Sequence, residues 1–309
     1  MTSMRGCCTG AVAALALFLT AGCGGAALPP TGDLTDDVTH EVAWAPPAPP
    51  APARTTLDWE TARQQSVPRA APPGWSGEYA PGLVHVDSGQ PQVRIARVPE
   101  PVRAGGASAR FELVRGDPVI NHNTRAELAT PIEPRDAERW YAFSVYLPAD
   151  WARDRSPEIL AQFHQHYGIG GEPPLAIGTR AGQWELQTAR DAHSDTARVG
   201  AYRTGGWTDW LVHARWSARG DGLLQIWRDG VPVPGFSGLR GPNTYRSRYG
   251  VYLKVGLYKW DWSQHNPTDT TRRVMYLDEL RIADTRAGVA VPGPPAPVGY
   301  GAPPAAPVR

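Results

Sequence analysis

GVYLKVGLYKW, residues 250–260, decides the fold class of this chain. Apolar side chains occupy every second position of the run, and the positions between them are mostly polar. A period of two is typical of a β-strand with one face in a core and the other facing outward. The run therefore predicts a strand that presents a polar face. The apolar set is Val251, Leu253, Val255 and Leu257, and the opposite set is Tyr252, Lys254, Gly256 and Tyr258.

Similar runs occur before and after this strand. Residues 157–168 alternate in the same way. A Gly-Asp-Gly turn lies between residues 210–217 and residues 223–228, and an Asp-Gly turn follows the second run. Such turns are typical of antiparallel hairpins. Residues 273–284 are typical of a closing strand. Because helical periodicity is nearly absent, we predict an all-β fold, a β-jelly roll or concanavalin-like sandwich of two antiparallel sheets.

The composition agrees with a folded β protein. The chain has 309 residues, of which 41% are hydrophobic and 20% charged, which is enough apolar material for a sizeable core. Its 33 Gly, 32 Pro and 12 Trp argue against a helical protein. Lys+Arg is 31 against Asp+Glu 30, so net charge favours neither a nucleic-acid partner nor a cationic membrane-surface protein.

The N-terminus has the pattern of a secretory signal peptide. Arg5 precedes an apolar run at residues 11–19, and small residues follow directly before Cys23, so we expect residues 1–22 to be removed. A Cys after Ala-Gly resembles a bacterial lipobox, although Thr20 stands where an aliphatic residue is usual. We favour lipidation of Cys23, with ordinary secretion as the alternative, and expect an extracellular or cell-surface lipoprotein of a bacterium. This anchor is the only membrane contact we expect.

The same region holds all the cysteines. Cys7, Cys8 and Cys23 are the three in the chain, so the mature protein keeps at most one and forms no internal disulfide. The fold must therefore be stabilised by its core alone.

Composition also divides the rest of the chain. Residues 23–54 are an Ala/Pro-rich linker and residues 287–309 a Pro/Ala/Gly-rich tail, and neither holds enough apolar surface to offset the entropy of ordering. We expect the tail to be disordered. Residues 55–286 remain as one domain, expected to act as a monomer. No second apolar stretch is long enough to cross a bilayer.

Lysine usage points to the strand at residues 250–260. Lys254 and Lys259 are the only lysines in the chain, so a lysine on a polar face suggests a need for a compact ammonium group, although chance placement on a solvated strand is the alternative. Lys254 and Tyr258 fall on one face about 13 Å apart. Gly256 between them is expected to clear space for a ligand against the backbone.

A second group of polar residues lies on the strand predicted at residues 157–168. Its polar face carries Gln162, His164 and His166, opposite Ile159, Ala161 and Phe163. His164 can be a general base or a substrate contact, it can be structural, or it can share a metal with His166. No cysteine and no convincing third ligand accompanies the pair, and so we predict no metal site.

A third group lies at residues 123–128. Asn123, Arg125 and Glu127 alternate along it and offer an amide, a guanidinium and a carboxylate. Arg125 and Glu127 can be no more than a surface ion pair, which stabilises little. Alternatively, Arg125 binds a carboxylate in two-point fashion and Glu127 holds it in place.

Together these motifs resemble those of a known family. R-x-E-L at 125–128, Q-x-H at 162–164 and Y-x-K-x-G-x-Y at 252–258 resemble, in the same order, the motifs of jelly-roll polysaccharide lyases such as the alginate lyases. The third motif and the predicted meander are more similar to the heparin lyase I and glucuronan lyase branch, over about residues 80–285. Alginate lyases commonly have Gln where this chain has Trp260, whereas the heparin lyase branch commonly has a basic residue at the position of Lys259.

The resemblance implies a polysaccharide lyase that cleaves an anionic, uronic-acid-containing polysaccharide by β-elimination. No cofactor is required, and a structural calcium ion is left open. Catalytic roles are implied for Arg125, Gln162, His164, Lys254 and Tyr258. Substrate contacts are implied for Asn123, Glu127, His166 and Tyr252.

The roles follow from the chemistry of the reaction. Arg125 and Gln162 are expected to neutralise the uronate carboxylate as charge develops in the transition state. The resemblance implies that Tyr258 protonates the leaving oxygen, and Tyr258 is also a candidate base, with Lys254 favouring its phenolate form. His164 is expected to be the base or a third carboxylate contact.

Two other functions compete with this prediction. A non-catalytic, lectin-like carbohydrate-binding domain can use the same sandwich, with aromatic platforms for sugars. Candidate platforms are Trp140, Tyr141, Trp184 and Trp260, although core packing is the commoner use of an aromatic residue in a sandwich. A glycoside hydrolase needs two acids flanking the scissile bond. The pair Asp278-Glu279 is expected to point to opposite faces of its strand.

Overall fold

The computed structural model places the folded part of the chain in one unit. The chain separates into two compact units, residues 1–47 and 48–309, and every described residue lies in the second. The predicted signal peptide, Cys23 and the linker to residue 54 therefore lie outside the described residues, as does His166. The described residues are 55–60, 76–78, 84–87, 90–93, 95–120, 122–165, 169–191 and 193–293.

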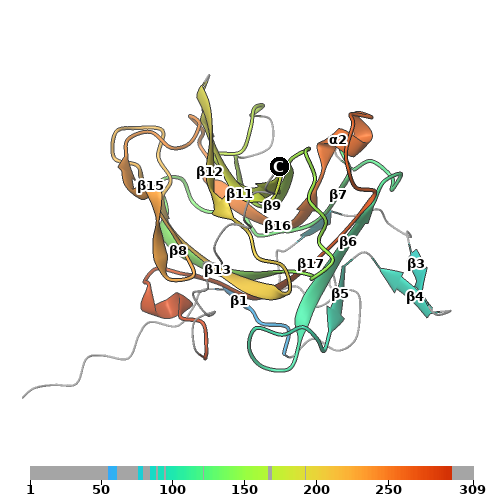
Figure 1. The fold of residues 1–309 in the computed structure, drawn as a ribbon. Coiled ribbons are helices and arrows are strands. Elements are labelled where there is room, and N and C mark those ends of the chain that lie inside the picture. The colour runs from blue at the N-terminus through green and yellow to red at the C-terminus, as the bar shows by residue number, and fades with distance from the viewer. Residues whose placement is uncertain are drawn as a thin grey trace, which may run out of the picture. The chain divides into compact units, whose positions relative to one another are not determined.

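Two antiparallel sheets face each other, which confirms the all-β prediction of a jelly-roll sandwich (Figure 1). Sheet A has the order β15 (Val231–Arg240), β14 (Leu223–Arg228), β13 (Gly206–Arg215), β8 (Glu138–Leu147), β17 (Arg272–Ala283), β6 (Ser108–Val114) and β5 (Ile95–Val98), with β1 (Thr55–Leu57) also paired to β17. Sheet B has the order β12 (His193–Ala201), β11 (Gln183–Arg190), β10 (Leu175–Arg180), β9 (Glu158–Gln165), β16 (Val251–Tyr258), β7 (Arg125–Ala129) and β2 (Ser76–Glu78). β3 (Val84–Asp87) and β4 (Gln90–Val93) form a separate hairpin.

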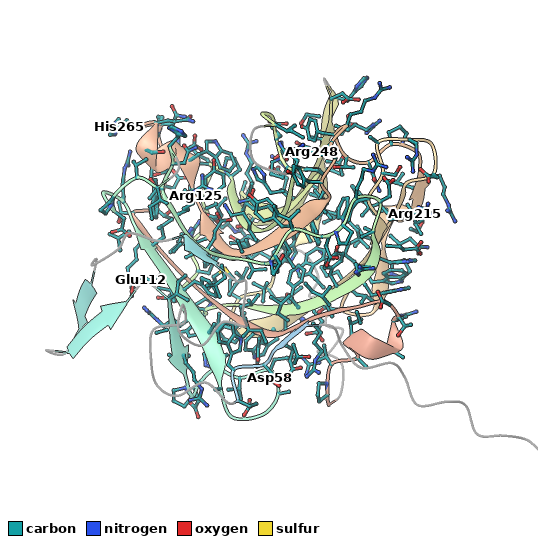
Figure 2. All side chains as sticks on the ribbon, turned by 180° about the vertical axis from the view of Figure 1, so that it is seen from behind. Asp58, Glu112, Arg125, Arg215, Arg248 and His265 are labelled. Atoms are coloured by element: carbon teal, nitrogen blue, oxygen red, sulfur yellow. The ribbon has the colours of Figure 1, made fainter. Side chains whose placement is uncertain are left out.

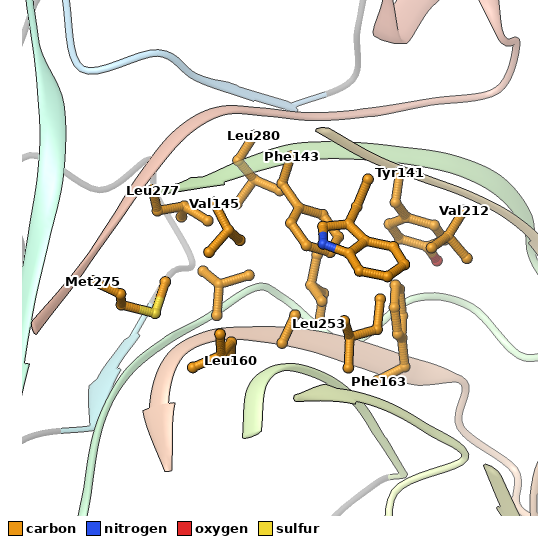
Figure 3. Close-up of a cluster of buried hydrophobic side chains, with 14 of the residues drawn as sticks. Tyr141, Phe143, Val145, Leu160, Phe163, Val212, Leu253, Met275, Leu277 and Leu280 are labelled. Carbon is orange, nitrogen blue, oxygen red and sulfur yellow. The ribbon is translucent and has the colours of Figure 1, made fainter. Parts of the chain in front are cut away.

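The core fills the space between the two sheets, as Figure 3 shows. The apolar face predicted for β16 is confirmed, because all four of its members belong to the core cluster. From sheet B, Phe163 packs edge-on against Tyr141 of sheet A, with ring centroids 4.9 Å apart. Full burial of a side chain such as Phe or Leu stabilises the fold by about 2 kcal/mol. The apolar faces therefore fix which face of sheet B remains for a site.

Strand β9 departs from simple alternation. Its register to β10 pairs Ala161 with Ile177 and then Ile159 with Gly178, so one residue of β9 is extra. The β-bulge turns Leu160 into the core, where the alternating pattern placed Ile159. The prediction was right for Ala161 and Phe163 and wrong for Ile159, because a bulge shifts the face of every residue beyond it.

Gly256 has a different role from the one predicted. Its φ is +137°, and a Cβ built on it would lie 2.2 Å from the carbonyl oxygen of Ala126 and 2.8 Å from the Cα of Glu127. The missing side chain therefore lets β16 approach the backbone of β7. The neighbouring strand, not a ligand, occupies the space that Gly256 clears.

The C-terminal boundary of the fold lies beyond residue 286. A 3₁₀-helix, η1 (Ala287–Val289), follows β17, and Val289 is buried against Ala142 and Ala283. The predicted disordered tail therefore does not begin at residue 287, because Val289 supplies an apolar anchor that composition alone concealed. Within the part of the chain that the structure describes, no helix is long and apolar enough to cross a membrane.

Candidate active site

A pocket of about 240 Å³ opens on sheet B, on the face opposite the core. Four of the five predicted catalytic residues line it: Arg125 from β7, Gln162 and His164 from β9, and Tyr258 from β16 (Figure 2 labels Arg125). The other lining residues are Ile159, Gly171, Glu172, Pro173, Gln187, Trp260 and Gln264.

Strand pairing brings the three motifs together. β16 lies between β9 and β7 and pairs with both. In the register, Tyr258 lies opposite Arg125, and Lys254 lies opposite Gln162. Residues that project from directly opposite positions share a face of the sheet. Segments 125–128, 162–164 and 252–258 therefore contribute to a single surface.

Arg125 lies against Tyr258 at one end of the pocket. Its Cζ is 4.3 Å from the centroid of the Tyr258 ring. Its Nε donates a hydrogen bond to the carbonyl oxygen of Ile120 at 3.1 Å, and its Nη1 lies 3.3 Å from Glu127 Oε2. The guanidinium is thus held in one orientation, as two-point recognition of a carboxylate requires.

Glu127 is the centre of a buried polar network beneath the pocket. Its side chain is 1% exposed and accepts a hydrogen bond from Gln162 Nε2 at 2.5 Å. The ammonium of Lys254, 2% exposed, lies 3.1 Å from Glu127 Oε2. Two cations, Arg125 and Lys254, therefore share one carboxylate in a region where an unpaired charge would be strongly destabilising.

This network changes two of the predicted positions. Lys254 and Glu127 are not among the residues that line the pocket. Lys254 was expected on the polar face of its strand, about 13 Å from Tyr258. Glu127 was expected at the substrate, but the buried ion pair of these two residues places both below the surface. The cation found over the Tyr258 ring is Arg125. Alternation gives the face on which a side chain lies, but the depth of each group is set by its cross-strand partner.

The surroundings of His164 favour its neutral form. Burial lowers the pKa of the imidazole below its ordinary value, and the nearby charge of Lys254 acts in the same direction. The ring Nδ1 lies 2.8 Å from the carbonyl oxygen of Gln165. Because a carbonyl only accepts, Nδ1 carries the proton, and Nε2 keeps a lone pair. His164 is therefore in the form that a general base requires.

Tyr252 and Asn123 were predicted to contact the substrate, but neither lines the pocket. Tyr252 is 3% exposed, with its ring 5.5 Å from that of His164. Asn123 accepts a hydrogen bond from Ser263 Oγ at 3.0 Å and is absent from the pocket lining. Among the described residues, no three His, Cys, Asp or Glu side chains gather as a metal site.

Among the pocket residues, Trp260 was predicted only as a candidate sugar platform, and sequence reasoning missed Gln187 and the loop residues 171–173. Trp260 begins the short helix α2 (Trp260–Ser263), and its ring lies 5.4 Å from that of Tyr258. Gln165 shapes the loop at 169–171 by donating to three of its carbonyl oxygens at 3.1 to 3.3 Å. The alternation of residues 183–190 is the signal that could have identified Gln187, whereas no pattern identifies a loop such as 171–173.

The aromatic candidates separate into three groups. Tyr141 and Trp184 are each 1% exposed within the core, so core packing explains both. Trp140 stacks on His213 and Trp227 of sheet A and is not part of the pocket. Trp260 alone of the four lines the pocket and is in position to stack on a sugar ring.

Lys259 anchors the turn that follows Tyr258. Its Nζ lies 3.2 Å from Asp154 and 3.1 Å from Glu158, and it is 1% exposed. Arg273 also pairs with Glu158, at 2.7 Å. This buried cluster of opposite charges fixes the end of β16, and with it the backbone that carries Tyr258 and Trp260.

The acid pair Asp278-Glu279 does not have the predicted arrangement. A β-bulge interrupts the pairing of β17 with β8 after Asp278, and Glu279 has φ +54°. The core cluster contains Leu277 and Leu280 but neither acid, so the two do not alternate across the sheet. Both belong to sheet A and are absent from the pocket lining, which leaves a hydrolase without its two flanking carboxylates.

Comparison with known proteins identifies the family of this chain. The family described as Polysaccharide lyase matches residues 59–281. No curated protein matches the chain. An endo-β-1,4-glucuronan lyase from the fungus Trichoderma reesei has a similar structure, with 20% identity, a TM-score of 0.54, and 70% of this chain and 96% of that chain covered. An alginate lyase from Pseudomonas aeruginosa has 19% identity and a TM-score of 0.41, over 57% of this chain and 82% of that chain.

Proposed function

Because the chain belongs to the polysaccharide lyase family, we propose that this lyase cleaves a uronic-acid-containing polysaccharide by β-elimination in the sheet B pocket. One observation carries the proposal: Arg125, Gln162, His164 and Tyr258 line the same cavity. A binding module needs only a platform for a sugar, whereas these four groups supply a cation, amide donors, a neutral base and a phenol.

The barrier to this reaction lies in the weak acidity of the C5–H bond beside a carboxylate. Arg125 is the group that neutralises the carboxylate, because its guanidinium is held by Ile120 and Glu127. Gln162 uses one amide hydrogen for Glu127, and its amide nitrogen carries a second one. Donors that are fixed in advance stabilise the enolate-like charge as it develops.

Two proton transfers complete the elimination. Nε2 of His164 accepts the proton from C5 of the uronate, and the electron pair of the C5–H bond forms the C4–C5 double bond. The C4–O bond breaks, and the hydroxyl of Tyr258 protonates the leaving oxygen. After the reaction, His164 releases its extra proton to solvent, and Tyr258 takes up a proton from solvent. The positive charge of Arg125, 4.3 Å from the Tyr258 ring, stabilises the phenolate left behind.

Lys254 contributes by holding other groups. Its ammonium balances Glu127, which in turn orients Arg125 and Gln162. Lys254 and Glu127 are therefore positioning residues in this proposal.

The first experiment offers a panel of polymers to the purified protein. Glucuronan, heparin, alginate and related polyuronates are incubated with it, and the ultraviolet absorbance of the unsaturated product is followed. We expect at least one to be cleaved, also with a chelator present, because the proposed steps use side chains only. Reducing ends released without unsaturation would instead indicate a hydrolase, and binding without turnover would indicate a lectin-like domain.

Tyr258→Phe tests the assignment of the acid. It should abolish turnover while circular dichroism shows an intact fold. The matched control is Tyr276→Phe, because Tyr276 lies on sheet A against Tyr146. Full turnover by Tyr258→Phe would remove the assigned role.

Export and lipid attachment at Cys23 are part of the proposed function. The supporting pattern is the Ala-Gly-Cys sequence after an apolar run. Labelling with a fatty acid should mark the full-length chain in a bacterial host but not Cys23→Ala. A labelled Cys23→Ala protein, or an unlabelled exported protein, would contradict lipidation.

A further inference from the structure

A second pocket, of about 300 Å³, lies outside the proposed catalytic residues. It is formed where three segments meet: residues 135–136 before β8, residues 216–219 after β13, and residues 244–250, which lead into β16. None of the residues in the three sequence motifs lines it. Figure 2 labels Arg248, which belongs to the third segment but does not itself line the pocket.

The two pockets share a wall. Tyr245 lines the second pocket, and its hydroxyl donates a hydrogen bond to the carbonyl oxygen of Glu172 at 2.8 Å. Glu172 and Gly171 line the first pocket. Gly171 has φ +105°, and a Cβ there would lie 2.8 Å from the Tyr245 hydroxyl, so the wall is tightly packed. The two pockets are therefore neighbours, separated by the contact between Tyr245 and residues 171–172.

The second pocket is positively charged. Arg135, Arg219 and Arg246 line it, and Asp136 is the only acid among its lining residues. Asp136 is already shared, because Arg219 lies 2.8 Å from it and Arg135 lies 3.5 Å from it. Arg246 is exposed, and within the described part of the chain it has no ion pair. The pocket therefore has an excess of guanidinium groups.

The same pocket offers aromatic surface. Tyr249 lines it and is 40% exposed, while Tyr245 forms the shared wall. An aromatic face beside a guanidinium suits a sugar that carries a carboxylate, because the ring packs on the apolar face of the sugar and the guanidinium pairs with its charge.

We propose that this pocket binds a second acidic sugar of the polysaccharide, away from the bond that is cleaved. The inference rests on the proposed function and narrows the substrate class to polymers that carry carboxylates on more than one sugar within reach of both pockets. We propose uniform binding there: a contact that binds the ground state and the transition state alike acts on KM and leaves kcat unchanged.

Arg246→Gln and Arg240→Gln test this. Both remove one exposed positive charge, but only Arg246 lines the pocket. With the polymer that is cleaved fastest, Arg246→Gln should raise KM about threefold to tenfold at unchanged kcat and weaken the salt dependence of KM. Arg240→Gln should keep the wild-type KM. Equal effects of the two variants, or no effect of Arg246→Gln, would overturn the inference.

A binding measurement separates this inference from the proposed function. Calorimetry with an oligomer of glucuronic acid, in the Tyr258→Phe background, compares the protein with and without Arg246→Gln. Weaker binding caused by Arg246→Gln supports the second pocket even if no polymer is ever cleaved. Turnover of a polymer together with unchanged binding would retain the proposed function and reject the second pocket. Absence of binding to the Tyr258→Phe protein would also reject it.

Discussion

The guanidinium of Arg125 lies over the ring of Tyr258, with its Cζ 4.3 Å from the ring centroid. The two residues come from β7 and β16 and face each other directly in the register. Arg125 is also 8% exposed and held by Glu127, so its charge is fixed at the phenol and the pocket. In the proposed mechanism, this pair links carboxylate binding to proton transfer.

Arg125→Lys should lower kcat/KM about 100-fold to 1,000-fold, because an ammonium cannot reproduce the two-point donor or lie flat over the ring. The measurement is the initial rate at which the ultraviolet absorbance of the unsaturated product increases. Arg155→Lys is the control, since Arg155 is exposed and pairs with Asp269. A loss of less than threefold for Arg125→Lys would show that the guanidinium is not needed.

Glu127→Gln should destabilise the fold by about 3 to 5 kcal/mol, because it leaves Lys254 and Arg125 buried without their shared carboxylate. Adding Lys254→Met should recover part of that loss, since it removes one of the two buried cations that have lost their carboxylate. Urea unfolding of the wild type, both single variants and the double variant gives the coupling energy. Additive single effects would mean that the ion pair does not couple the two residues.

Gly256→Ala should destabilise the domain by about 2 to 4 kcal/mol. A Cβ there meets the Ala126 carbonyl oxygen at 2.2 Å, and the φ of +137° adds backbone strain. Gly230→Ala separates the two causes, because φ is +78° at Gly230 and nothing lies within 4 Å of its Cβ position. Gly230→Ala should cost about 1 kcal/mol. Equal losses in urea unfolding would leave strain as the only cause.

The pH dependence of kcat/KM should reflect His164. Its pKa is lowered, so the imidazole becomes protonated, and inactive as a base, only below its ordinary value of 6.5. We therefore expect full activity at pH 7 and an acid limb below pH 6.5. His164→Gln should lower the rate about 100-fold to 10,000-fold and remove this limb. His213→Gln, on β13 of sheet A, is the control. An acid limb with its midpoint above pH 7, or one that survives in His164→Gln, would assign the base elsewhere.

Much of the site was predictable because its parts are local patterns. Alternation placed Gln162 and His164 on one face of β9 and Tyr258 on the polar face of β16, and the structure finds all three at one pocket. The same reasoning failed at Ile159, because one extra residue in the strand reverses the face. It also placed Lys254 too close to the surface, because burial depends on Glu127 of another strand.

The sequence by itself determined the fold class, the core face of β16 and the chemical groups available to the site, because side chains alternate across any extended strand whatever its neighbours. Only the tertiary structure decided that β7 and β9 flank β16, that Lys254 is paired with Glu127 below the pocket, and that Tyr245 joins a second pocket to the first. These relationships connect residues far apart in the chain, and they depend on which backbones pack together and how closely. No local pattern contains that information.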